Sequence, residues 1–127
     1  MFRLGLSSKA KLNTVHKDLQ KVVELAITLT EVDFTVTEGI RTLERQKTLV
    51  AKGASKTMNS RHLTGHAVDL AALIDGKLSW DWPLYHKIAD AMKEAAKQLN
   101  IPIVWGGDWT KGFRDGPHFE LSRKSYP

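Results

Sequence analysis

The Asp75-Gly76 pair, placed between two strand-like segments, restricts the fold of this 127-residue sequence more than any other feature. The segments 67–73 and 77–80 on either side of it are rich in apolar residues, and a two-residue connection of this composition favours a tight β-hairpin. Asp69 then lies in a strand. The sequence therefore predicts an antiparallel sheet.

Three segments have the spacing of apolar residues that is typical of helices packed on one face. We expect an amphipathic helix from Thr14 to about Thr30, a second from Leu43 to Lys52 and a third over 83–99. Thr42 is suited to cap the second helix and Gly53 to end it in a left-handed conformation. These segments predict about three helices.

Further short strands are expected over 34–37, 103–105 and 117–121. Helices and strands alternate without the regular strand-helix-strand order of a parallel sheet, which favours an α+β fold with a small antiparallel sheet. The length suits one domain over 1–127, with no room for a separate binding domain.

Composition narrows the classes of function. With 42% apolar and 26% charged residues the chain is globular, and it lacks both an apolar run long enough to cross a membrane and a secretory signal at its start. The net charge of +5 favours polyanionic partners or simple solubility equally, because the basic residues are scattered. Cysteine is absent, so any transition metal must be held by His, Asp or Glu.

The residues that could carry chemistry are concentrated in Gly39–Thr42, Ser60–Asp69 and Asp115–Glu120. Two neutral imidazoles with one carboxylate form a zinc ligand set that leaves a fourth tetrahedral position open for water. A His and an Asp seven residues apart are more often unrelated surface groups. Here, however, His118 supplies a second imidazole and Asp115 a spare carboxylate.

These motifs resemble the D-Ala-D-Ala carboxypeptidase and VanY-type metallopeptidases, and within them the phage L-alanyl-D-glutamate endopeptidases that serve as endolysins. The family's Ser-x-His-x-x-Gly-x-Ala-x-Asp stands at Ser60–Asp69, and its acid-x-x-His stands at Asp115–His118. Gly39–Thr42 and Trp105–Trp109 are also similar to the endolysin pattern. The resemblance covers nearly the whole chain and implies a fold like that of Hedgehog and the D-Ala-D-Ala peptidases.

The resemblance further implies one zinc ion held by His62, Asp69 and His118. Asp115 would be the base that takes a proton from the attacking water and returns it to the leaving amine. Arg41 is the candidate that stabilises the oxyanion.

Four further residues are considered around such a site. Glu120 shares a strand face with His118 and competes with Asp115 for the role of base, although we favour Asp115 and expect Glu120 to support a ligand. Ser60 is likewise expected to lie next to the ligands, where it supports one of them or borders the substrate groove. His66 has a helical metal spacing to His62, but Gly65 argues against a helix, so we interpret it as a pocket or surface residue.

The four tryptophans, Trp80, Trp82, Trp105 and Trp109, are more typical of a core than of a ligand platform, and Trp109 alone is expected to wall a groove.

The leading hypothesis is a zinc endopeptidase that cuts the L-Ala–D-Glu bond of peptidoglycan stem peptides during phage lysis. It would be made in the host cytoplasm and released to the cell wall by a holin. We expect a monomer that binds neither nucleic acid nor a membrane stably. The alternatives are a D-Ala-D-Ala carboxypeptidase or dipeptidase, with specificity set by the loops 55–59 and 110–114, and a non-catalytic basic module that binds a polymer.

Overall fold

The structure is a computed structural model that describes residues 1–55, 58, 60–109 and 114–127. The helices are α1 (Leu6–Leu12), α2 (Lys17–Leu29), α3 (Leu43–Ala51) and α4 (Trp82–Leu99), with 3₁₀ turns η1 (Arg61–Thr64) and η2 (Gly106–Asp108). The strands are β1 (Phe34–Glu38), β2 (Ala67–Ile74), β3 (Lys77–Ser79), β4 (Ile103–Trp105) and β5 (His118–Leu121).

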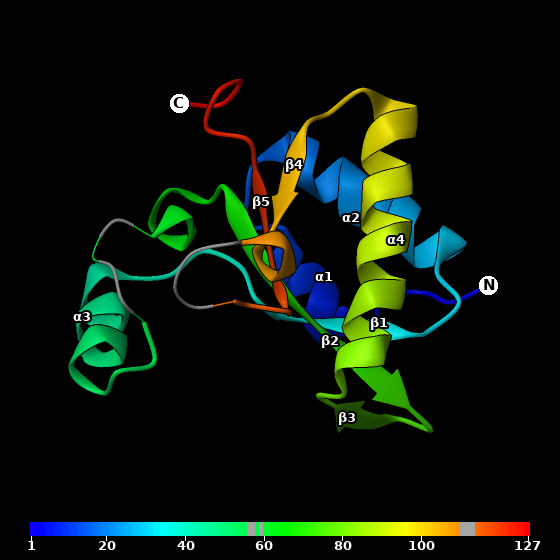
Figure 1. Cartoon of the computed structure of the whole chain (residues 1–127), viewed down its shortest axis with the longest axis horizontal. Helices are drawn as coiled ribbons and strands as arrows, with labels where there is room; N and C mark the ends of the chain where they lie inside the picture. The colour runs from blue at the N-terminus through cyan, green and yellow to red at the C-terminus, as the bar shows by residue number, and fades with distance from the viewer. Residues whose placement is uncertain (56–57, 59, 110–113) are drawn as a thin grey trace.

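The strands form one antiparallel sheet in the order β1-β2-β5-β4, and β3 pairs with β2 through the hairpin at Asp75-Gly76 (Figure 1). Asp75 and Gly76 both have positive φ, as the tight turn requires. The strand β2 is therefore central, and its neighbours β1 and β5 come from opposite ends of the sequence.

Helices α2 and α4 pack against one another, and α4 also contacts β2 and β4 (Figure 1). Their apolar stripes enclose the core together with alternate residues of the strands, such as Val68 and Leu70 of β2 and Phe119 of β5. The helix α3 stands apart from these two helices (Figure 1). One face of the sheet is thus covered, and polar side chains at the intervening strand positions lie away from the core.

The α+β class and the antiparallel sheet are confirmed, and the three predicted helices correspond to α2, α3 and α4. Thr42 caps α3 by accepting a hydrogen bond from the Arg45 amide, and Gly53 after this helix has a φ of +76°. The helix α1 was not predicted, because its short segment LSSKAKL shows little periodicity. No helix among the described residues has the length and apolar character needed to cross a membrane.

The expectation that the tryptophans lie in the core is correct for Trp105, which is buried, and wrong for Trp80 and Trp82, which are 53% and 39% exposed. Trp80 lies between β3 and α4, and Trp82 is the first residue of α4. Both residues follow the hairpin, where the chain lies at the edge of the hydrophobic core.

Two glycines, one in η2 and one in the turn before β5, allow these segments to pack closely on β4 and α4. A Cβ atom on Gly107 would lie 2.3 Å from a ring carbon of Trp105, and one on Gly116 would lie 2.7 Å from a ring carbon of Tyr85. The Trp105 indole donates a hydrogen bond of 2.7 Å to the carbonyl of Gly116. This contact fixes the segment that carries Asp115 and His118.

We predict that Gly107→Ala lowers the free energy of unfolding by about 1–3 kcal/mol, because the Trp105 ring must move out of its packed position. Gly5→Ala is the control, since a Cβ atom there meets nothing within 4 Å and the N-cap position costs at most about 1 kcal/mol. Denaturant titration measures both changes. Equal stability of the two variants would contradict this packing.

Candidate metal centre and active site

The site is built on a row of side chains that crosses three strands. In the β2–β5 pairing Asp69 lies directly opposite His118, and in the β1–β2 pairing Glu38 lies opposite Asp69. Directly opposed residues of antiparallel strands point to the same face and come within contact distance. Because Val68 and Phe119 face the core, Asp69 and His118 face the other side of the sheet.

His62 reaches the same place from the turn η1. The Ser60 hydroxyl caps this turn by accepting a 3.2 Å hydrogen bond from the His62 amide, and Gly65 ends it with a φ of +75°. His62 Nδ1 lies 2.8 Å from the carbonyl oxygen of Gly39. A carbonyl can only accept, so Nδ1 carries the proton and Nε2 is directed at Asp69.

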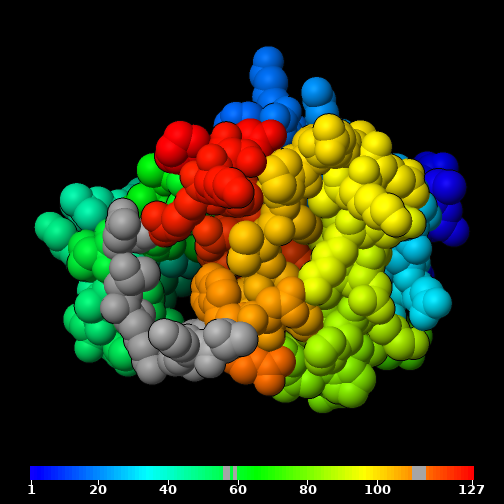
Figure 2. Space-filling model, turned by 45° about the horizontal axis from the view of Figure 1, so that its top comes forward, coloured from blue at the N-terminus to red at the C-terminus, as the bar shows by residue number. Residues whose placement is uncertain are grey.

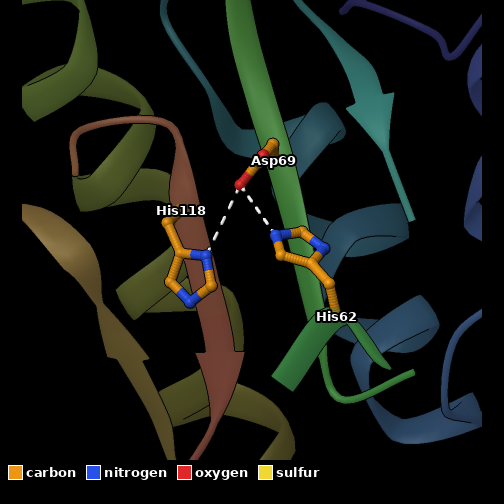
Figure 3. Close-up of side chains that lie close together, drawn as sticks. All are labelled: His62, Asp69 and His118. Atoms are coloured by element: carbon orange, nitrogen blue, oxygen red, sulfur yellow. Dashed lines mark hydrogen bonds and ion pairs between the residues drawn. The ribbon is translucent and has the colours of Figure 1, made fainter. Parts of the chain in front are cut away.

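His62, Asp69 and His118 together form a three-donor cluster. One oxygen of Asp69 lies 3.1 Å from His62 Nε2 and 3.5 Å from His118 Nδ1 (Figure 3). One ligand atom from each residue lies within 4.8 Å of the other two, so the group could hold a metal ion. His62 and His118 are buried and Asp69 is half-buried.

The surroundings of the two rings fit a metal. His118 Nε2 donates a hydrogen bond to Glu120 Oε1 at 2.7 Å, so Nδ1 is the nitrogen available to bind a metal. In the same way, the contact of His62 Nδ1 with the Gly39 carbonyl leaves Nε2 available. Such outer partners fix the tautomer and orientation of metal-binding histidines. The donor set of two imidazoles and one carboxylate is that of open zinc sites.

Asp69 is the electrostatic centre of the cluster. Burial opposes its ionisation, but the hydrogen bonds and the charge interactions with His118 and His62 together outweigh burial and lower its pKa. Conversely, burial acts to lower the pKa of His118, while its hydrogen bonds to Asp69 and Glu120 raise that pKa to about 9. The Asp69 carboxylate therefore interacts favourably with both imidazole rings.

Asp115 lies at the start of the turn that leads into β5, and its carbonyl accepts a 3.2 Å hydrogen bond from the His118 amide. A Cβ atom on Gly106 would lie 3.0 Å from that of Asp115, so η2 packs tightly behind the acid. Burial and then the charge of Asp69 raise the pKa of Asp115, while His118, His62 and Arg41 act in the opposite sense. Asp115 is thus a carboxyl group that shares the field of the cluster without being one of its three donors.

Arg41 is held in a fixed orientation beside the cluster. Its Nε and Nη2 atoms each donate to a different oxygen of Glu38 at 2.7 Å, and its Nη1 atom donates to Gln46 at 2.7 Å. Nη2 also lies 3.8 Å from Asp69. Burial disfavours the charge, but the hydrogen bonds to Glu38 and the negative charges of Glu38, Asp69 and Asp115 together outweigh burial and raise the pKa, so Arg41 remains cationic.

Glu120 lies on the far side of the His118 ring from the cluster. Its second carboxylate oxygen is 3.9 Å from Nε of Arg61 and 3.8 Å from Nε of Arg123. Arg61 is buried and also donates to the carbonyl oxygens of Leu121 and Tyr126. Figure 2 shows the C-terminal residues in red against the green segment that follows α3.

The remaining expected residues are placed as follows. The ring of Trp109 is half-buried, with its centroid 5.2 Å from that of His118, so it borders the site. His66 contacts the Thr64 hydroxyl at 2.6 Å and is not a member of the donor cluster found among the described residues. Glu38 and Arg61 are site residues that the sequence did not indicate. Alternation along β1 would place Glu38 on the core face with Val36, and the register shift between these two residues brings it opposite Asp69 instead.

Comparison with known proteins decides which family has this arrangement. The family model described as "Phage L-alanyl-D-glutamate peptidase" matches residues 1–122. The chain belongs to this family. It is 36% identical to the L-alanyl-D-glutamate peptidase of Escherichia phage T5, over 94% of this chain and 98% of that protein.

Two solved structures are also similar to this member of the phage L-alanyl-D-glutamate peptidase family. The L-Ala D-Glu endopeptidase ChiX of Serratia marcescens is 44% identical, with a TM-score of 0.92 and coverage of 98% of this chain and 94% of that chain. The vancomycin resistance D,D-dipeptidase VanXYg has a TM-score of 0.58 at 20% identity, covering 84% and 50% respectively, which shows a shared fold alone.

We predict that one zinc ion binds per chain and that His118→Ala removes this binding, because only two of the three donors remain. His66→Ala is the matched control: it removes an imidazole near His62 in sequence that does not belong to the cluster. Isothermal titration of metal-free protein with zinc measures the stoichiometry. Loss of the ion in the His66→Ala variant would contradict the assigned ligands.

Proposed function

We propose that this chain is a zinc-dependent endopeptidase that cleaves the L-Ala–D-Glu bond of peptidoglycan stem peptides. The observation that carries the proposal is the cluster of His62, Asp69 and His118 beside Asp115 and Arg41, in a chain whose family match covers residues 1–122. His62, Asp69 and His118 would hold the zinc ion, which would supply Lewis-acid chemistry by polarising the scissile carbonyl and lowering the pKa of a water molecule.

In this proposal Asp115 is the general base. It takes a proton from the attacking water and returns it to the amine of D-Glu as the peptide bond breaks. The raised pKa of Asp115 suits both steps, because a carboxyl group that binds a proton more readily also returns it at the second step. Glu120 is directed away from the cluster by its bond to His118, so it orients that ring.

Arg41 is proposed to bind the oxyanion that develops on the scissile carbonyl. Its guanidinium is anchored on both sides by Glu38 and Gln46, so little reorganisation is needed when negative charge appears. Ser60 contributes indirectly by fixing the backbone of His62, and Trp109 forms one wall beside His118.

We expect Asp115→Asn to lower kcat/KM by about 10²–10⁴-fold and to leave zinc binding intact, because the amide cannot accept the proton. Glu120→Gln is the matched control, since it also replaces a carboxylate by an amide next to the site. Its effect should fall mainly on zinc affinity, by up to about 10–100-fold. If Glu120→Gln alone abolished turnover with zinc retained, the assignment of the base would be wrong.

The nearest alternative is a D-Ala-D-Ala carboxypeptidase or dipeptidase with the same metal centre. The similarity to VanXYg is one of fold and does not favour this activity. The loops expected to set specificity, 55–59 and 110–114, lie partly outside the described residues. A non-catalytic basic module that binds an anionic polymer is disfavoured by the presence of Asp115 next to the complete donor set.

Product analysis separates these functions. Peptidoglycan incubated with the zinc-loaded protein should gain new amino termini on D-Glu, and EDTA should stop the reaction because it removes the ion. Mass spectrometry of the released muropeptides identifies the bond that is cut. Release of free D-Ala alone would instead support the carboxypeptidase, and binding without cleavage would support the module.

We further propose that the protein acts as a monomer in phage-induced lysis, reaching the cell wall from the host cytoplasm by a holin, with no nucleic acid as a partner. The phage relatives support the lytic role. The net charge of +5 supports attraction to the anionic envelope.

A further inference from the structure

Two exposed tryptophans follow the β2–β3 hairpin. Trp80 and Trp82, which we call the indole pair, are 53% and 39% exposed. Both rings contact Tyr85 of α4, with centroids 6.4 Å and 5.6 Å away. Single exposed apolar residues are ordinary, but neighbouring exposed aromatic side chains mark surfaces that bind a partner.

The indole pair is connected to the proposed base from both sides. The guanidinium of Arg114, the residue before Asp115, lies 4.8 Å from the ring centroid of Trp82. Tyr85 packs against Gly116, the residue after Asp115. The indole pair is therefore continuous with the turn that carries Asp115, at a separation on the order of one or two side chains.

The proposed substrate has a second chemical part close to the bond that is cut. In peptidoglycan the amino group of L-Ala is joined to the lactyl group of an N-acetylated amino sugar. One residue spans only about 3.3–3.6 Å when extended. An enzyme that cuts after L-Ala therefore works within about one residue of a saccharide chain.

We propose that the indole pair is a subsite for the glycan strand of peptidoglycan, in which Trp80 and Trp82 pack against the faces of the amino sugars. This inference rests on the proposed endopeptidase function. A pyranose ring offers C–H groups on its faces and hydroxyl groups at its rim, so an indole can cover a face while the rim stays hydrated. The cationic Arg114 over Trp82 adds a hydrogen-bond donor for hydroxyl or acetamido oxygens.

The subsite would also explain how a catalytic domain holds an insoluble polymer. Trp80 directly follows β3 and Trp82 is the first residue of α4, so the indole pair is held between two regular elements of the fold. Trp80 has a single ring partner among the described residues, Tyr85, so most of its surface is available for a ligand.

The test compares two substrates of the zinc-loaded full chain: a disaccharide-linked stem peptide and the same peptide with an acetyl group in place of the sugars. Trp80→Ala should lower kcat/KM for the disaccharide-linked substrate about 3–10-fold relative to the sugar-free peptide. Trp80→Phe should retain most of the ratio because it keeps an aromatic face. Leu99→Ala, at 37% exposure and roughly 25 Å further along α4, is the control that should leave the ratio unchanged.

An unchanged ratio in Trp80→Ala, or an equal loss on both substrates, would overturn the subsite and leave the endopeptidase function standing. If the wild-type protein cleaved neither substrate, the proposed function would fail and the subsite with it. A selective loss that Trp80→Phe restores would support the subsite.

Discussion

The antiparallel register between β2 and β5 is the constraint on which the site depends. It places Asp69 opposite His118 on the face of the sheet that lies away from α2 and α4, while Val68 and Phe119 enter the core. A shift of one residue would move the two donors to opposite faces, and the core residues with them. Burial of the apolar face of the sheet against α2 and α4 therefore also sets the geometry of the metal cluster.

Electrostatic interactions hold together the residues that the strand register brings close. The half-buried carboxylate of Asp69 is stabilised by His62 and His118. The second nitrogen of each ring is held by an oxygen, from the Gly39 carbonyl for His62 and from Glu120 of the same strand for His118. Around these residues, carboxylates are paired with guanidinium groups. Glu38 orients Arg41, and Arg61 lies beside Glu120. The donors are thus arranged by contacts that do not themselves belong to the cluster, which is how a site keeps its geometry before a ligand binds.

Local signals made part of this predictable. The Asp75-Gly76 turn placed Asp69 in a strand, and the alternation of β5 placed His118 and Glu120 on one face. Glu38 and Arg61 could not be identified in the same way, because their roles arise from pairing between segments distant in the sequence. The exposure of Trp80 and Trp82 was likewise unpredictable, because the sequence does not show whether an aromatic side chain is buried by neighbouring elements.

The central claim is that two imidazoles and one carboxylate from η1, β2 and β5 bind one zinc ion with a position left open. Anomalous diffraction from crystals of the zinc-loaded protein, recorded on both sides of the zinc absorption edge, tests it most directly. We expect a single peak within about 2.0–2.2 Å of His62 Nε2, His118 Nδ1 and an Asp69 oxygen, with no fourth protein donor. A peak elsewhere in the molecule, or a fourth side chain closing the coordination sphere, would contradict the account.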